Sequence, residues 1–401
     1  MKRIDFRRVF VIAGLMALVI VYAVLWLRMI SSSAERTGSD FIVFYTAGRI
    51  AQADGAAYVY EPELQQEVQE AEVGFRLVPG QVLLYNHIPY LIPILTVLIS
   101  ENYVVSFVRW AVLLLALCAG GVAALAGLLR RAGWGRAEVW LAAAGMLLFF
   151  PLFVSLMNGQ DTAFTFFGLC LYLVGVLTGR DWLAGLGLAL TTVRPHVTVL
   201  LAVPFLFRRQ KVFGWFCLGA GVLGVGSLIV LGVDGMRGFL DLLLVSVSGN
   251  WYGLKEPVMV NLVGLLWRIA PGLGGQAIHW IGWAVYGATL IGLCVLWARS
   301  REIAEKQIGL AVTLAVFAVP HLHYHDLTLL LVPAVCLLLV VVCRGLAAAP
   351  ELSLLPLGLS LALLFGKFIP VLQYNLPILV MLYLALALWF PHKFFRAKEA
   401  L

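Results

Sequence analysis

The feature that most constrains this fold is a succession of apolar runs that repeats along the chain. A helix of about 20 apolar residues is long enough to cross the hydrocarbon core of a bilayer. The 401-residue chain is 62% hydrophobic and only 12% charged, and that charged fraction is about half of what a soluble domain carries. The runs therefore predict an all-α integral membrane protein in which residues 1–401 form a single transmembrane domain.

The first apolar run, Val9–Leu27, follows a basic N-terminus and predicts an uncleaved first membrane helix, since a signal-peptide core has only about 7–15 residues. Basic residues in short loops stay in the cytoplasm, so the chain after this helix emerges outside. We expect a first outer loop over residues 31–87, which is acidic and contains a short helix over Pro62–Glu72. Residues 234–257 are predicted to form a second outer loop.

Two apolar segments contain proline and are predicted to be broken helices, because proline interrupts the helical hydrogen-bond ladder. Val82–Ser100 contains two prolines and is predicted to be an interfacial or re-entrant element on the outer side. Trp182–Phe207 contains Arg194-Pro195 at its middle and basic residues at both ends. Two half-length helices that meet at Arg194-Pro195 would keep both basic ends in the cytoplasm, so we expect a broken hairpin.

With these broken elements, the sequence predicts a bundle of about 10–13 transmembrane helices. The uninterrupted spans that follow the first helix are expected at Trp110–Leu129, Ala137–Met157, Thr162–Thr178, Val212–Val233, Gln276–Ala298, Ile308–Val319, Leu327–Cys343, Leu352–Ile369 and Asn375–Phe390.

The net charge of +7 lies mostly in short loops and at the termini, so it carries topology information and does not predict a nucleic-acid partner. All six cysteines lie in or at the ends of apolar runs and form no CxxC pair. We expect them to be packing residues, with no disulfide or metal framework.

Under this topology most of the unusual polar residues gather at the outer membrane boundary. An exception is Arg194, which reaches from mid-membrane, where an arginine costs about 2.5–3.5 kcal/mol and normally has a partner or faces a cavity. It could contact a phosphate, which its planar fork suits, or it could form an ion pair with Asp161 or Asp326. The boundary residues are Asp40, Asn86, His87, Asn158, Gln160, Asp161, Asn261, His321, His323, His325 and Asp326.

Asp40 and the histidines each permit two interpretations. Asp40 precedes the expected helix Phe41–Ala51, so it could be an N-cap, a catalytic base, or both. The alternate spacing of His321, His323 and His325 puts them on one face only in an extended segment. We expect no metal there and interpret His321 as a hydrogen-bond partner of a phosphate or a sugar.

Several motifs, in order along residues 38–330, resemble one family. The stretch Gly38–Tyr60 (GSDFIVFYTAGRIAQADGAAYVY) resembles the start of the polyprenol-phosphate-mannose-dependent mannosyltransferases, which are glycosyltransferase family 87 of the GT-C superfamily. Asn158-Gly159-Gln160 resembles the family's G-Q motif, and a Pro-His at the outer end of a later helix is also part of the resemblance. Trp182–Pro195 (WLAGLGLALTTVRP) is similar to the family's segment that ends in Lys-Pro, with Arg in place of Lys. Asn261–Arg268 (NLVGLLWR) resembles another family stretch but lacks its Ser.

The resemblance implies a GT-C-type multi-pass enzyme of the plasma membrane with its active site on the outer face. The enzyme would transfer a sugar, most simply mannose, from a polyprenyl-phosphate donor to a lipid or glycan acceptor, with inversion and without a cofactor or metal. Asp40 would be the catalytic base, and the residues implied in donor and phosphate binding are Arg194, His196, His321 and Gln160. Further site candidates are Tyr45, Asn86, His87, Asn158, Asn261, His325 and Asp326.

Two other classes of protein remain open at this point. A transporter or lipid flippase would use the broken hairpin and Arg194 as a midplane substrate site. The collection of polar residues at one face, and the lack of an evident internal repeat, argue against a transporter. A non-catalytic membrane scaffold of a glycan-assembly complex is the third possibility.

Overall fold

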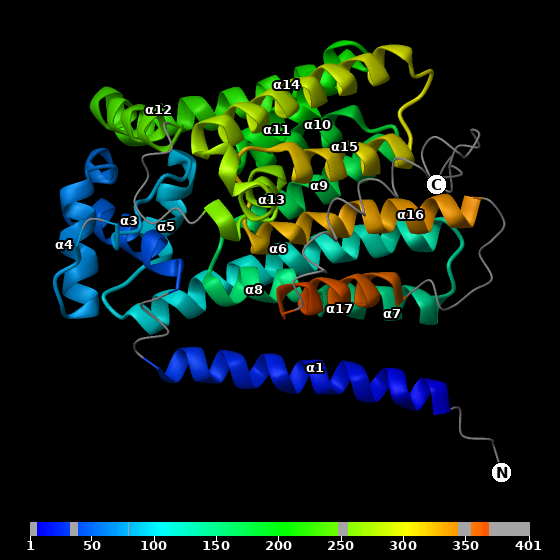
Figure 1. The fold of residues 1–401 in the computed structure, drawn as a ribbon, viewed down its shortest axis with the longest axis horizontal. Coiled ribbons are helices and arrows are strands. Elements are labelled where there is room, and N and C mark those ends of the chain that lie inside the picture. The colour runs from blue at the N-terminus through cyan, green and yellow to red at the C-terminus, as the bar shows by residue number, and fades with distance from the viewer. Residues whose placement is uncertain (1–5, 33–38, 79, 248–255, 344–353, 369–401) are drawn as a thin grey trace.

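The computed structural model describes residues 6–32, 39–78, 80–247, 256–343 and 354–368, and every regular element in these ranges is helical. Figure 1 shows the long helices lying roughly side by side along the long axis of the molecule. The α-helices are α1 (Phe6–Ser31), α3 (Phe41–Ala53), α4 (Pro62–Val73), α5 (Ile92–Leu98), α6 (Tyr103–Arg131), α7 (Arg136–Leu147), α8 (Phe150–Asn158), α9 (Thr162–Leu177), α10 (Asp181–Leu190), α11 (Pro195–Ala202), α12 (Gln210–Val247), α13 (Leu262–Ile269), α14 (Gly275–Arg299), α15 (Glu305–Ala318), α16 (Leu331–Cys343) and α17 (Leu355–Phe368). The 3₁₀ turns are η1 (Ala56–Tyr58), η2 (Pro89–Leu91), η3 (Thr191–Val193), η4 (Val203–Leu206), η5 (Glu256–Val258), η6 (Pro271–Leu273) and η7 (Tyr324–Leu330).

The all-helical, multi-pass fold expected from the apolar runs is confirmed. Among the described residues, 4 helices are by length and composition able to cross a membrane, and 5 if the bent pair α7 and α8 counts as one span. Other apolar helices have 10–17 residues, which is less than the length of about 20 that a full crossing needs. The count of 10–13 from the sequence therefore includes several segments that the structure builds from shorter helices. The expected span Asn375–Phe390 lies outside the described residues.

The segment Ala137–Met157 differs from the single span that we expected. It consists of α7 and α8, which are bent by 44° at a short break. Phe149 at the break is extended, with ψ of 120°, and Pro151 lies in the first turn of α8. Because proline has no N–H to donate, it fits the start of a helix and not the interior.

The broken hairpin over residues 182–207 is confirmed. Helix α10 and turn η3 end at Arg194, whose backbone is non-helical, and α11 restarts at Pro195. At the two ends of this segment, Arg209 Nε donates to Asp181 Oδ1 at 3.0 Å. The chain therefore returns to the end of the bundle from which it started.

The elements α3, α4 and α5 cap one end of the bundle, at the left of Figure 1. The short helix expected over Pro62–Glu72 is α4, and the expected re-entrant segment Val82–Ser100 contains only η2 and the 7-residue α5. Gln65 holds these pieces together, because its side chain donates to Val59 O at 2.8 Å and accepts from Tyr85 N at 2.6 Å.

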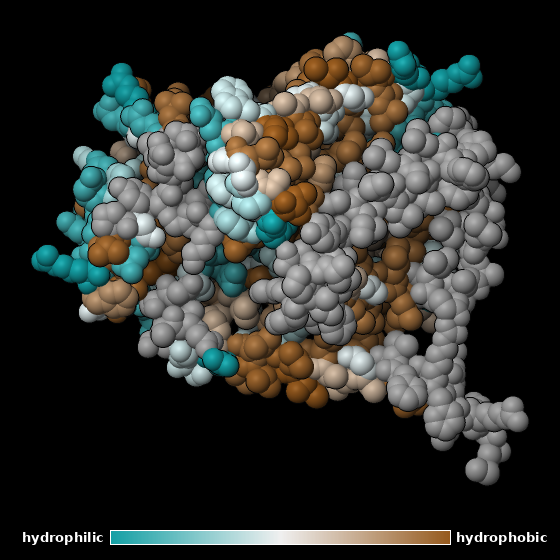
Figure 2. All heavy atoms as spheres, in the orientation of Figure 1, coloured by the Kyte–Doolittle hydropathy of each residue, from teal (hydrophilic) through white to brown (hydrophobic). Residues whose placement is uncertain are grey.

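The opposite end carries the basic residues that follow α6, η4 and α14. Arg208 donates to the backbone carbonyl of Arg301 there. In Figure 2 hydrophilic side chains gather toward the two ends of the long axis, over α4 and near the turn after α14, with hydrophobic side chains between them. This pattern is typical of a helical bundle that spans a bilayer along that axis.

Helix α12 changes direction at Gly232, whose φ is 66° and ψ is −176°. Beyond the kink the chain stays helical as far as Val247, so the part of the expected second outer loop that the structure describes is largely helix. This arm packs against the first loop: a Cβ on Gly235 would lie 2.8 Å from Ala57 Cα, and Phe239 contacts Tyr60 with ring centroids 5.1 Å apart.

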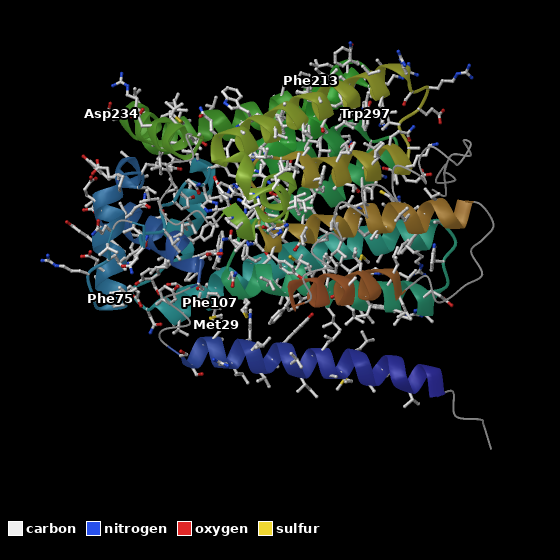
Figure 3. All side chains as sticks on the ribbon, viewed as in Figure 1. Met29, Phe75, Phe107, Phe213, Asp234 and Trp297 are labelled. Atoms are coloured by element: carbon white, nitrogen blue, oxygen red, sulfur yellow. The ribbon has the colours of Figure 1, made fainter. Side chains whose placement is uncertain are left out.

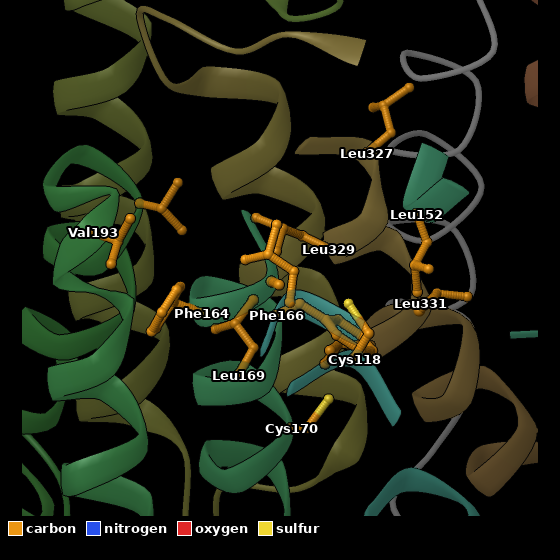
Figure 4. Close-up of a cluster of buried hydrophobic side chains, with 14 of the residues drawn as sticks. Cys118, Leu152, Phe164, Phe166, Leu169, Cys170, Val193, Leu327, Leu329 and Leu331 are labelled. Atoms are coloured by element: carbon orange, nitrogen blue, oxygen red, sulfur yellow. The ribbon is translucent and has the colours of Figure 1, made fainter. Parts of the chain in front are cut away.

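The core lies where α6, α9 and α16 meet, and Figure 4 shows Cys118, Cys170 and Leu331 among its buried side chains. Glycines let α9 and α10 approach closely, since a Cβ on Gly168 would lie 2.6 Å from Gly187 O. Close approach at small residues is typical of helix packing in membranes. Helix α1 packs through two buried residues. Tyr22 stacks on Phe153 of α8 with ring centroids 3.9 Å apart, and near the end of α1 Figure 3 shows Met29 close to Phe107 of α6.

Candidate functional site

Asp40 stands at the N-cap position of α3, but its side chain does not cap the helix. Gln160 Nε2 instead donates to Asp40 Oδ2 at 2.7 Å. Among the described residues no hydrogen bond to the other oxygen, Oδ1, is found. One carboxylate oxygen is thus fixed, and the other remains able to accept a proton or a hydrogen bond.

Gln160 reaches Asp40 because the turn between α8 and α9 is tightly packed. Gly159 has a φ of 68°, which only glycine adopts easily, and a Cβ on it would lie 2.8 Å from Phe41 Cβ. Trp110, fully buried, donates from Nε1 to Gly159 O at 2.7 Å. The Asn-Gly-Gln motif therefore places the turn directly against the start of α3.

A buried charged cluster, defined here as His87, Asp161, Arg194 and Asp326, begins at the next residue. Asp161 Oδ1 is 2.9 Å from Arg194 Nη2, and its Oδ2 is 2.6 Å from His87 Nδ1. Arg194 Nε also donates to Asp326 Oδ1 at 3.3 Å. The two ion-pair partners that the sequence offered as alternatives for Arg194 are thus both present.

The cluster is locked in place by Thr162 and by the backbone of η7. Thr162 Oγ1 donates to Asp326 Oδ1 at 2.7 Å, and His323 N donates to Asp326 Oδ2 at 3.2 Å. Burial raises the pKa of Asp161, but Arg194 and then His87 outweigh burial and hold that pKa below its ordinary value. Asp161 is therefore ionised, and a buried charge with this many partners is rigidly oriented.

After α15, His321 and His323 lie in a non-helical loop and His325 lies at the start of η7, and this segment is near Asp40 and the charged cluster. The ring centroids of His321 and His323 are 4.6 Å apart, and those of His323 and His325 are 5.9 Å apart. Burial and then His325 lower the pKa of His323 to about 4, against the raising effects of Asp326 and Asp40. Burial likewise lowers the pKa of His321 well below its ordinary value. Both imidazoles are therefore neutral near pH 7.

His196 joins this loop from the first turn of α11, where its side chain interacts with the backbone of His321. Its carbonyl accepts a hydrogen bond from Tyr286 OH at 2.9 Å. Among the described residues no group of three His, Cys, Asp or Glu side chains is arranged to hold a metal ion.

Four other candidates have positions that differ from one another. Asn261 is buried, and both polar groups of its side chain are hydrogen-bonded to the backbone: its Nδ2 donates to Val319 O at 2.6 Å and its Oδ1 accepts from Gly264 N at 3.0 Å. Tyr45 OH donates to the backbone carbonyl oxygen of Glu101 at 3.0 Å. The ring of Tyr45 lies next to the aromatic rings of Phe41 and Tyr103. Asn158 ends α8 and Asn86 precedes His87, and both are partly exposed.

The sequence placed Asp161 at the outer boundary but not at the centre of the site, where the structure puts it. The signal was available, because Asp161 directly precedes an apolar run and follows Gly159-Gln160, as an N-cap would. Thr162 had no comparable signal, since a threonine inside an apolar run is common.

The fold and the site together define a polytopic helical membrane protein whose charged and titratable residues meet at helix ends and helix breaks. A model of glycosyltransferase family 87 matches residues 89–320. Because the match covers more than half of the chain, this chain belongs to glycosyltransferase family 87 and is a membrane glycosyltransferase. A comparison with curated proteins found no match. Gln160, Asp161 and Arg194 lie inside the matched residues, whereas His87 lies just before them and Asp40 lies well before them.

Proposed function

We propose that this enzyme transfers a sugar, most simply mannose, from a polyprenyl-phosphate donor to a lipid or glycan acceptor on the outer face of the plasma membrane. The observation that carries this proposal is the carboxylate of Asp40, which is oriented by Gln160 and is not used to cap α3. A lipid-linked donor suits a site at helix ends, because the prenyl chain can stay in the bilayer while the sugar phosphate reaches the polar residues.

The topology supports an outer location for this site. The cap formed by α3, α4 and α5 lies at the end of the bundle opposite to the basic residues after α6 and α14. Basic residues are concentrated on the cytoplasmic side of membrane proteins. This distribution of basic residues supports an outer location for Asp40.

The proposed reaction is a single in-line displacement of the GT-C type, with inversion at the anomeric carbon. Asp40 accepts the proton of the acceptor hydroxyl while the acceptor oxygen bonds to C1. The bond from C1 to the phosphate oxygen breaks, and its electron pair leaves with the polyprenyl phosphate. Arg194 and the neutral imidazoles of His196 and His321 are the proposed hydrogen-bond donors to the phosphate oxygens. The donor already carries a good leaving group, so the proposal includes no cofactor or metal.

The test is sugar transfer by the purified protein in detergent. Radiolabelled polyprenyl-phosphate mannose and a crude acceptor lipid extract serve as substrates for wild type, Asp40→Asn and Asp54→Asn. Asp54 is the matched control, because it lies exposed at the other end of the same helix. We expect Asp54→Asn to match wild type and Asp40→Asn to lose about 10²- to 10⁴-fold in rate. Full activity of Asp40→Asn would refute its role as the base, and label that crosses vesicles without a covalent product would indicate a transporter.

A further inference from the structure

The positive charge of Arg194 is already balanced by carboxylates. Its Nη2 lies 2.9 Å from Asp161 and its Nε lies 3.3 Å from Asp326, so two negative charges surround one positive charge. A donor phosphodiester adds a further negative charge. Since unbalanced charge is costly where water is excluded, the site needs a second cation.

His321 and His323 do not provide this cation, and His325 is directed at Asp326, with its Nε2 3.5 Å from Asp326 Oδ2. Burial is the largest cause that lowers the pKa of His321 and of His323, the latter to about 4. Both can donate hydrogen bonds from a neutral ring, but neither carries a charge near pH 7.

Unlike His321 and His323, His87 has an ion-pair partner. Its Nδ1 is 2.6 Å from Asp161 Oδ2, and its side chain is 11% exposed whereas that of Asp161 is 0% exposed. Among the described residues its Nε2 has no hydrogen-bond partner. A carboxylate on one ring nitrogen stabilises the protonated ring and leaves the other nitrogen as a donor.

Two observations link His87 to the neighbourhood of Asp40. Its ring packs on Phe44 with centroids 4.5 Å apart, and Phe44 lies one helical turn after Asp40 on the same face of α3. Its partner Asp161 directly follows Gln160, which holds Asp40 at 2.7 Å. His87 is thus oriented by the same turn that orients the proposed base.

We propose that His87, protonated and held by Asp161, is the cation that binds the phosphate of the lipid-linked donor. This inference rests on the proposed function, because it names the phosphate-binding group of that same site. Arg194 keeps its proposed hydrogen bond to the phosphate and in addition holds Asp161 and Asp326, while His87 supplies the positive charge, because that of Arg194 is already balanced by these carboxylates. No proton moves from His87 during transfer; the ring offsets the charge that develops on the departing phosphate.

The proposal predicts a pH dependence of phosphate binding that is lost when His87 is replaced. His325, whose Nε2 lies 3.5 Å from Asp326 Oδ2, is a second imidazole beside a carboxylate, and the His87 variants separate the two. The groups that face His87 are Asp161, Arg194 and Asp326, which stay ionised, and two buried phenols. Burial raises the pKa of Tyr60 and of Tyr85 well above 10. A ring that loses its proton also loses the charge that holds the phosphate, so phosphate affinity should fall as pH rises.

The experiment measures binding of farnesyl methyl phosphate, which is a phosphodiester like the donor and keeps one negative charge at every pH tested. Farnesol is the uncharged ligand control. The proteins are wild type, His87→Gln, His87→Arg, Asp40→Asn and His279→Gln, all checked for folding by thermal unfolding. His279 is the matched control, because it forms a similar pair with Glu256 at 2.6 Å but contacts none of the residues of the charged cluster.

We expect wild type, Asp40→Asn and His279→Gln to bind the phosphodiester more weakly at about pH 8 than at about pH 6. His87→Gln should lose roughly 10- to 100-fold in affinity at the lower pH, as expected for one charged hydrogen bond, and should lose the pH dependence. His87→Arg should keep the affinity and lose the pH dependence. Farnesol binding should be the same in all variants.

A pH-independent wild type, or wild-type affinity in folded His87→Gln, would overturn the proposal. If His87→Gln does not fold, the wild-type pH profile and His87→Arg decide by themselves. Phosphate binding that depends on His87 without any sugar transfer would support this inference and count against the proposed function. Transfer that needs Asp40 but does not depend on His87 would do the reverse.

Discussion

Substituting Gly159 by alanine should damage both stability and transfer, for two separable reasons. Its φ of 68° is left-handed, which costs an L-residue about 1–2 kcal/mol. A Cβ would also lie 2.8 Å from Phe41 Cβ, and overpacking of this kind costs about 1–3 kcal/mol. Gly159→Ala should therefore lose about 2–5 kcal/mol of unfolding free energy and shift Gln160 away from Asp40.

Gly179 provides the matched control, because its φ is 73° but a Cβ there would meet nothing within 4 Å. Gly179→Ala should lose only the left-handed strain, about 1–2 kcal/mol. The assays are equilibrium unfolding in mixed micelles and sugar transfer. The reasoning is refuted if the two variants lose the same free energy and keep the same transfer rate.

Three further predictions concern the site. Asp161→Asn leaves Arg194 with one carboxylate, and breaking a buried ion pair costs about 3–5 kcal/mol of unfolding free energy. The control Asp234→Asn removes an exposed pair with Arg237 and should cost less than about 1 kcal/mol in the same unfolding experiment. The pKa of His323 is about 4 in the folded protein and ordinarily near 6.5. The unfolded chain therefore binds more protons, and the stability of the wild type should fall as pH drops from about 6.5 to 4. His323→Gln should lose less stability on acidification, and equal losses of the two proteins in thermal unfolding would contradict this. Gln160→Ala should slow transfer, because Asp40 loses the hydrogen bond that orients it, and a wild-type rate would show that Asp40 needs no such support.

The charged cluster draws on segments that lie far apart in the chain. His87 comes from the first loop, Asp161 from the α8–α9 turn, Arg194 from the α10–α11 break and Asp326 from η7. Asp161 and Arg194 stand at the end of a helix or at a break in one, His87 lies in a loop and Asp326 in the first turn of η7, so none of the four lies on the regular face of a long helix. This arrangement allows a membrane bundle with an apolar interior to hold several charges at one place.

The sequence by itself determined the class of protein, the first helix, the short helix α4 and the reversal at Arg194. These features follow from local signals: the length of apolar runs, the distribution of basic residues and the position of proline. The motif around Asp40 and the Asn-Gly-Gln turn also indicated the family that the match over residues 89–320 shows.

Only the tertiary structure decided which polar residues meet. Asp40 could cap α3 on local grounds, and its bond to Gln160 required the turn at Gly159 to pack against Phe41. Arg194 had two possible acidic partners, and the fold supplies both. Ion pairs and hydrogen bonds between distant segments depend on how the helices pack, and spacing along the chain carries no information about which side chain faces which across that packing.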